Sequence, residues 1–149
     1  MVATFKRILV PVDGSPTSDK ALAAALQLAG DTGASLRLFH SVELTYATGL
    51  DFDGQATLFL RAAGEEILAK ALAAAQAAGV AADSQLLDHP GERLGEAVAD
   101  AARHWQADLI VVGTHGRHGV GRVLLGSGAE QIVRLAPVPV LVIRGESAT

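Results

Sequence analysis

Cysteine is absent from this chain of 149 residues, and aromatic residues make up only 4% of it. The lack of cysteine excludes a disulfide framework and thiol chemistry, and it suits a reducing compartment. Half of the residues are hydrophobic, so the core must be built from Ala, Val, Leu and Ile, as in packed helices and buried parallel strands. A chain of this length forms one domain, residues 1–149, without a metal or disulfide to stabilise it.

Long apolar runs and a one-sided charge are also missing. No run approaches the roughly 18 apolar residues of a membrane span, and the apolar stretch before Asp13 is too short for a signal peptide. The formal net charge is −4, with acids and bases mixed along the chain, so the basic stripe of a nucleic-acid binder is lacking. We therefore expect a cytoplasmic protein that has neither nucleic acid nor a membrane as a partner.

Short β-branched runs alternate with Ala/Leu-rich stretches at helical spacing. Ser15 followed by Pro16 is typical of a helix start, and Gly79 is typical of a helix end. Gly64 is a weak point inside a long predicted helix. The apolar runs predict strands over 8–12, 35–41, 81–87, 108–112 and 138–143. The periodic stretches predict a first helix that begins at 16 and ends between Gly30 and Gly33. They predict further helices over 55–78, 90–105 and 127–135, with a loop over 42–54.

This alternation of strands and helices predicts an α/β fold. Right-handed crossovers give a single-domain, doubly wound, five-stranded parallel sheet of strand order 3-2-1-4-5, with helices on both faces. Ligands of such sheets bind beyond the carboxyl ends of the strands, where the strand order reverses. Two turns lie there: residues 11–15 and the segment that begins at Gly113.

The glycine-rich segment 113–128 combines several features of an anion site. Glycines let backbone amides approach a ligand closely, and successive amides in such turns form anion-binding nests. The segment ends at a predicted helix start, where free amides and the helix dipole favour a phosphate. Ser127 and Glu130 have the spacing of a capping box, so Ser127 either caps this helix or donates to phosphate. Arg117 and Arg122 supply positive charge nearby.

Two standard phosphate motifs do not fit this segment. Ser127 stands where a P-loop needs lysine, and Gly119-x-Gly121 lacks the third glycine of a dinucleotide-binding fingerprint. From the glycine count alone, an ordinary glycine-rich loop remains an open interpretation.

A different pattern does fit, because Gly113-x2-Gly116-x9-Gly126-Ser127 is similar to the nucleotide loop of the universal stress protein family. That family divides into members that keep this loop and bind ATP, and members that lost it and do not. This chain keeps the loop in full and so resembles the ATP-binding branch. The resemblance extends to KRILVPVDGS at 6–15, FHSV at 39–42, DLIVVGTHG at 108–116 and VPVLVI at 138–143.

The resemblance implies a binding site for ATP, ADP or AMP, with Mg²⁺ as a possible companion of the phosphates. Asp13 would be a hydrogen-bond partner of the base or ribose, although an Asp after a strand also commonly forms a turn. Ser41 would face the adenine, where many relatives have an apolar residue. The glycine loop would border the ribose and hold the phosphate chain. The cofactor-binding residues thus implied are Pro11, Val12, Asp13, Ser41, Val112, Gly113, Gly116, Arg117, Gly126 and Ser127.

The histidines and the tryptophan have simpler interpretations. We expect His40 to end a strand with a structural hydrogen bond and His104 to be solvated. His115 and His118 are a poor metal site without a carboxylate partner, and no metal ligand is assigned. Trp105 completes an apolar helical stripe and is expected in the core rather than against a ligand.

These observations predict a nucleotide-binding regulatory protein of the stress response, in which bound ATP changes a surface that a partner reads. A slow ATPase or phosphotransferase is an alternative, but no base or metal carboxylates stand in a pattern that phosphoryl transfer requires. No catalytic residue is therefore assigned, and at most weak hydrolysis is expected. A dimeric stress module without a nucleotide is the third possibility.

The last predicted strand, 138–143, lies at a sheet edge in the order 3-2-1-4-5. It carries no charge before Arg144, whereas exposed edges are usually blunted by charge, bulges or brevity. A two-fold axis would pair two such strands in an isologous contact. The chain is therefore expected to form a homodimer through this strand, as the family resemblance also implies.

Overall fold

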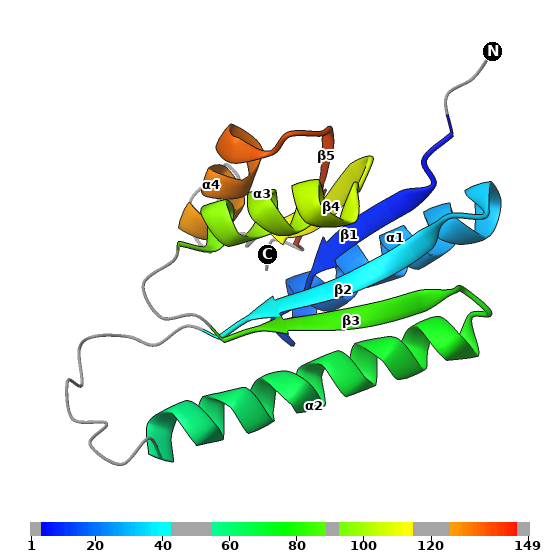
Figure 1. Cartoon of the computed structure of the whole chain (residues 1–149). Helices are drawn as coiled ribbons and strands as arrows, with labels where there is room; N and C mark the ends of the chain where they lie inside the picture. Colours follow the sequence, from blue (N-terminus) through cyan, green and yellow to red (C-terminus); the bar gives the residue numbers. More distant parts are fainter. Residues whose placement is uncertain (1–3, 43–54, 89–92, 115–125, 146–149) are drawn as a thin grey trace.

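The computed structural model describes residues 4–42, 55–88, 93–114 and 126–145, which form one parallel sheet with helices on both faces (Figure 1). The strand order is β3-β2-β1-β4-β5, so the predicted fold and topology are confirmed. In chain order the elements are β1 (Arg7–Pro11), α1 (Pro16–Thr32), β2 (Ser35–Ser41), α2 (Gln55–Ala77), β3 (Ala82–Leu87), α3 (Leu94–Trp105), β4 (Leu109–Thr114), α4 (Ser127–Leu135) and β5 (Val140–Arg144).

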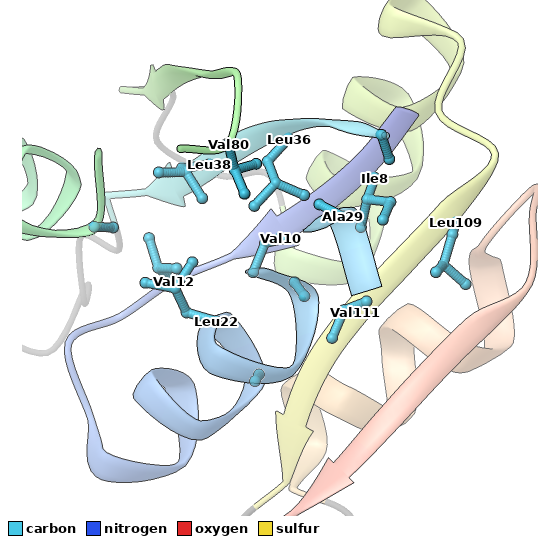
Figure 2. Packing of buried hydrophobic residues seen from close by; sticks show 14 of the residues in the cluster. Ile8, Val10, Val12, Leu22, Ala29, Leu36, Leu38, Val80, Leu109 and Val111 are labelled. Atoms are coloured by element: carbon cyan, nitrogen blue, oxygen red, sulfur yellow. The ribbon is translucent and has the colours of Figure 1, made fainter. Parts of the chain in front are cut away.

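The core has two halves, one on each face of the sheet. Successive side chains of a strand point to opposite faces, and the central strand β1 follows this rule with full burial of Ile8, Leu9 and Val10. Ile8 and Val10 lie in one cluster with residues of α1, as Figure 2 shows, and this cluster also includes residues of α2. Leu9 packs with residues of α3 and α4 on the opposite face. Both faces are therefore covered, as the continuous apolar runs predicted.

Helix α1 begins and ends where its local chemistry dictates. The Ser15 hydroxyl accepts a hydrogen bond from the Ser18 amide at 3.2 Å, and Pro16 is the first helical residue. Gly33 ends the helix with φ of 77°, a left-handed conformation that glycine adopts without steric cost. The predicted cap and the predicted helix end between Gly30 and Gly33 are thus both confirmed.

Several predicted boundaries were wrong by one to four residues. Helix α3 begins at Leu94, with Arg93 at its N-cap, and not at Pro90, which lies outside the described ranges. Strand β5 begins at Val140 instead of 138, because Pro139 has no amide hydrogen and contributes only its carbonyl, which accepts from Ile110 at 3.0 Å. The predicted bounds of β2, 35–41, are confirmed. Four other elements differ by one or two residues at an end: β1 spans 7–11, β3 82–87, β4 109–114 and α2 55–77.

Trp105 is buried at the end of α3, as expected for a core residue. The guanidinium carbons of Arg7 and Arg37 lie 4.7 and 5.0 Å from the centroid of its ring, a cation–π arrangement.

Arg37 also donates two hydrogen bonds of 2.9 Å to Asp83 of β3. This hydrogen bonding lowers the pKa of Asp83 and raises the pKa of Arg37. The bidentate pair links neighbouring strands β2 and β3.

Candidate functional site

A cavity of about 630 Å³ opens at the carboxyl ends of β1, β2 and β4. From β1 the chain adds β2 and β3 on one side of the sheet and then β4 and β5 on the other, so the strand order reverses between β1 and β4. Ligands of parallel sheets bind at such a reversal. One wall comes from the apolar side of α2, through Leu60, Ala63 and Ile67. The cavity thus lies where the sequence predicted a site.

Three helices begin at this cavity. Ser15 and Ser18 at the start of α1, Leu94 at the start of α3, and Gly126 at the start of α4 all line it. Helix N-termini carry partial positive charge and unsatisfied amides, which favour an anion. Within the described lining there is no lysine or arginine, and Asp13 is its sole carboxylate. Backbone dipoles are therefore the source of positive potential in this part of the cavity.

Asp13 forms a turn between β1 and α1. Its Oδ1 accepts a hydrogen bond from the Ser15 amide at 2.9 Å, and its own amide donates to the Ser18 hydroxyl at 3.1 Å. The turn-forming role is thus present, and Asp13 also lines the cavity. Among the described residues, none donates a hydrogen bond to its Oδ2.

Most of the predicted site residues meet at this cavity. Gly116 and Arg117 lie outside the described residues, as do His115, His118 and Arg122. Ser127 is the first residue of α4, and Gly126 rather than Ser127 occupies the N-cap position. The predicted residues that line the cavity are Pro11, Val12, Asp13, Ser41, Val112, Gly113 and Gly126.

Gly113 has a packing role that the sequence did not reveal. A Cβ at this position would lie 2.5 Å from the Thr17 carbonyl oxygen and 2.9 Å from the Thr17 carbonyl carbon. Only a residue without a side chain lets β4 pass this close to the first turn of α1. The two elements whose ends line the cavity are therefore held together at Gly113.

His40 ends strand β2 with the hydrogen bond that was expected. Its Nδ1 lies 2.7 Å from the Val12 carbonyl oxygen, and a carbonyl only accepts, so Nδ1 carries the hydrogen and donates. A Cβ on Gly64 of α2 would lie 2.6 Å from His40 Cδ2. Gly64 is therefore a point of close approach between α2 and the end of β2, rather than simply a weak point in the helix.

Sequence reasoning missed two groups of lining residues. Thr17 and Ser18 lie just after the predicted turn 11–15, and their place in the first helical turn beyond the reversal of strand order is the signal that would have found them. The α2 wall had no such signal, because an apolar helix face that borders a cavity has the same pattern as one in the core.

Two further features bear on the class of site. Among the residues whose positions are described, no group of three or more His, Cys, Asp or Glu could hold a metal ion. Likewise, none of the described helices combines the length and apolarity that a membrane crossing demands.

Comparison with known sequences places the chain in a family. The sequence profile of the Universal stress protein family matches residues 4–144. A universal stress protein of Methanocaldococcus jannaschii is 35% identical over 143 residues, which are 94% of this chain and 82% of the relative. One from Thermus aquaticus is 37% identical over 141 residues, or 94% of this chain and 99% of the relative.

Solved structures agree with this assignment. A universal stress family protein from Burkholderia pseudomallei has a TM-score of 0.78 at 34% identity, over 96% of this chain and 98% of that protein. A universal stress protein in complex with cAMP has a TM-score of 0.69 at 25% identity, and the match covers 95% of this chain and 98% of that protein. One from Archaeoglobus fulgidus in complex with dAMP has the same fold, with a TM-score of 0.71 at 23% identity. That match covers 95% of this chain and 99% of that protein. This chain belongs to the universal stress protein family.

Proposed function

We propose that this chain is an adenine-nucleotide-binding regulatory protein of the cytosol. The observation that carries the proposal is the cavity at the strand-order reversal, where three helix N-termini converge on one space. The cAMP complex of a relative supports adenine nucleotides as the ligand class. In this proposal the phosphates lie at the helix starts, and the base lies against the apolar wall of α2.

ATP is the proposed physiological ligand, with Mg²⁺ on its phosphates. The support is the unbroken spacing Gly113-x2-Gly116-x9-Gly126-Ser127, because glycines at these positions allow close approach of backbone amides to a phosphate chain. Bound ATP would then bridge segments that are far apart in the sequence, and a partner would read the resulting surface in the stress response.

Nucleotide binding has a direct thermal signature. At a concentration 100 times its dissociation constant, ATP stabilises the folded state by about 2.7 kcal/mol. For a domain of this size the melting temperature is expected to rise by about 5–10 °C. Differential scanning calorimetry with millimolar ATP and Mg²⁺ measures the shift, and GTP at the same concentration controls for phosphate binding alone. No shift and no heat of binding with ATP would refute the proposal.

We also propose a homodimer built on strand β5, which is at one edge of the sheet. The Ile110 amide donates to the Pro139 carbonyl, and the Gly145 amide donates to Thr114. Odd-numbered residues of β5 therefore face β4, and the amides of Val140 and Val142 face outward from the sheet. Three large apolar residues nearby are exposed: Val133 (44%), Leu135 (38%) and Leu141 (41%). An open strand edge flanked by apolar surface is the expected composition of an isologous interface.

The double variant Val142→Pro/Leu141→Lys should convert this dimer to a monomer. Proline removes an amide that faces outward, so the β4–β5 hydrogen bonds are kept, and lysine adds charge to the exposed edge. Light scattering on a gel-filtration column measures the mass of parent and variant. Leu58→Lys is the control, because Leu58 is 64% exposed on α2, away from β5. A monomeric parent, or a double variant that remains dimeric, would contradict the proposal.

A further inference from the structure

The hydrogen-bond ladder between β1 and β2 ends one rung early. Odd-numbered residues of β2 exchange hydrogen bonds with β1: the Ser35 amide donates to the Lys6 carbonyl at 2.9 Å, and Phe39 accepts from the Val12 amide at 2.8 Å. The next rung of a regular parallel ladder would join the Ser41 amide to the Val12 carbonyl. That hydrogen bond is absent between these two described residues.

A side chain occupies the Val12 carbonyl instead. His40 Nδ1 donates to this oxygen at 2.7 Å. The ring cannot easily turn away, because it is packed against the backbone of α2 at Gly64, where even a Cβ would lie 2.6 Å from it. The His40 ring thus substitutes for the backbone amide that follows it in the chain.

We propose that His40 is a positioning residue of the nucleotide site: it holds the Val12 carbonyl and so leaves the Ser41 amide open as a donor to the ligand. This inference rests on the proposed function. Val12, His40 and Ser41 all line the cavity, and the Ser41 amide is on the side of β2 that faces β1. A ring nitrogen of the adenine base is the matching acceptor, since N1, N3 and N7 each carry a lone pair in the plane of the ring.

Substitutions at position 40 separate this role from simple packing. His40→Leu removes the donor, so the Ser41 amide can complete the ladder with Val12 and is lost to the ligand. His40→Asn keeps a donor, because asparagine Nδ2 is separated from Cβ by the same two bonds as histidine Nδ1. The loss of one ligand hydrogen bond weakens binding by about threefold to tenfold, so His40→Leu should bind AMP that much less tightly than His40→Asn.

The test is calorimetric titration of the full chain with AMP and with its 1-deaza, 3-deaza and 7-deaza analogues, each of which replaces one ring nitrogen by CH. For the parent and for His40→Asn, one analogue is expected to bind about threefold to tenfold less tightly than AMP. For His40→Leu this penalty should disappear. His104→Leu is the matched control, since exposed His104 makes a similar bond from Nδ1 to the Asp100 carbonyl at 2.8 Å, away from the cavity.

Amide hydrogen exchange by NMR supplies a readout that needs no nucleotide. Without ligand, the Ser41 amide should exchange quickly in the parent and be protected in His40→Leu. If His40→Leu weakens the binding of AMP and of all analogues equally and the analogue penalty remains, His40 has a purely structural role and the inference is overturned. A Ser41 amide that is protected from exchange in the ligand-free parent would also overturn it. If the parent binds no adenine nucleotide, the proposed function fails together with this inference. Binding of AMP without any analogue penalty refutes the role of His40 alone.

Discussion

Gly113→Ala is expected to lower the free energy of unfolding by about 1–3 kcal/mol, the range for overpacking in a well-packed site. The new Cβ would lie 2.5 Å from the Thr17 carbonyl oxygen, which belongs to the first turn of α1. That turn is fixed by the Ser15 cap and by Pro16, so it cannot yield without the loss of other interactions. Urea denaturation followed by circular dichroism measures the change.

Gly30→Ala is the matched control for this prediction. Gly30 is in the exposed part of α1, and a Cβ there meets no atom within 4 Å. Because alanine also restricts the unfolded chain more than glycine does, the substitution should stabilise the protein by about 0.4–1 kcal/mol. A Gly113→Ala variant as stable as the parent would show that β4 and α1 can separate without cost.

Phe39→Ala is expected to cost about 3–5 kcal/mol, the usual range for the truncation of a buried phenylalanine. Phe39 is 1% exposed and packs in the core half formed by α3 and α4. It also lines the cavity, so its loss would enlarge the site as well as weaken the core. The free energy of unfolding from a denaturant titration measures the effect.

Phe59 provides the comparison within the same chain, because it is 72% exposed on α2. Phe59→Ala should change stability by no more than about 0.5 kcal/mol, as is usual for surface positions. Equal effects at positions 39 and 59 would contradict the assignment of Phe39 to the core. Where Phe39→Ala does not fold, Phe39→Leu should show a smaller loss of the same sign.

The fold could be predicted because β1, β4 and β5 contain apolar runs, and because helix-forming stretches separate the successive strands. In β4, the run Leu109 to Val112 is buried on both faces, and burial of this kind depends on composition alone. The end of that strand was missed, since Gly113 and Thr114 continue the ladder by pairing with Ile143 and Arg144. Such pairing depends on a partner strand that is distant in the sequence, so local pattern cannot reveal it.

The candidate site was predictable only in part. The turn at Asp13 has a local signature, and the rule for parallel sheets locates it at the cavity. The roles of Gly64 and His40 depend on how closely α2 approaches β2, a distance set by tertiary packing. Gly113 illustrates the same limit, because a glycine needed for contact with Thr17 is indistinguishable in sequence from one needed by a phosphate.

The convergence of α1, α3 and α4 on the cavity has a consequence for how its charge responds to the cell. Peptide dipoles neither titrate nor undergo acylation, so the contribution of the helix starts to the attraction for an anion does not vary with proton concentration or with lysine modification. Acidification would instead act on the ligand, by protonating its phosphates near their second pKa of about 6. For the nucleotide proposed as the ligand, this dipole contribution to binding would follow the ionisation state of the phosphates.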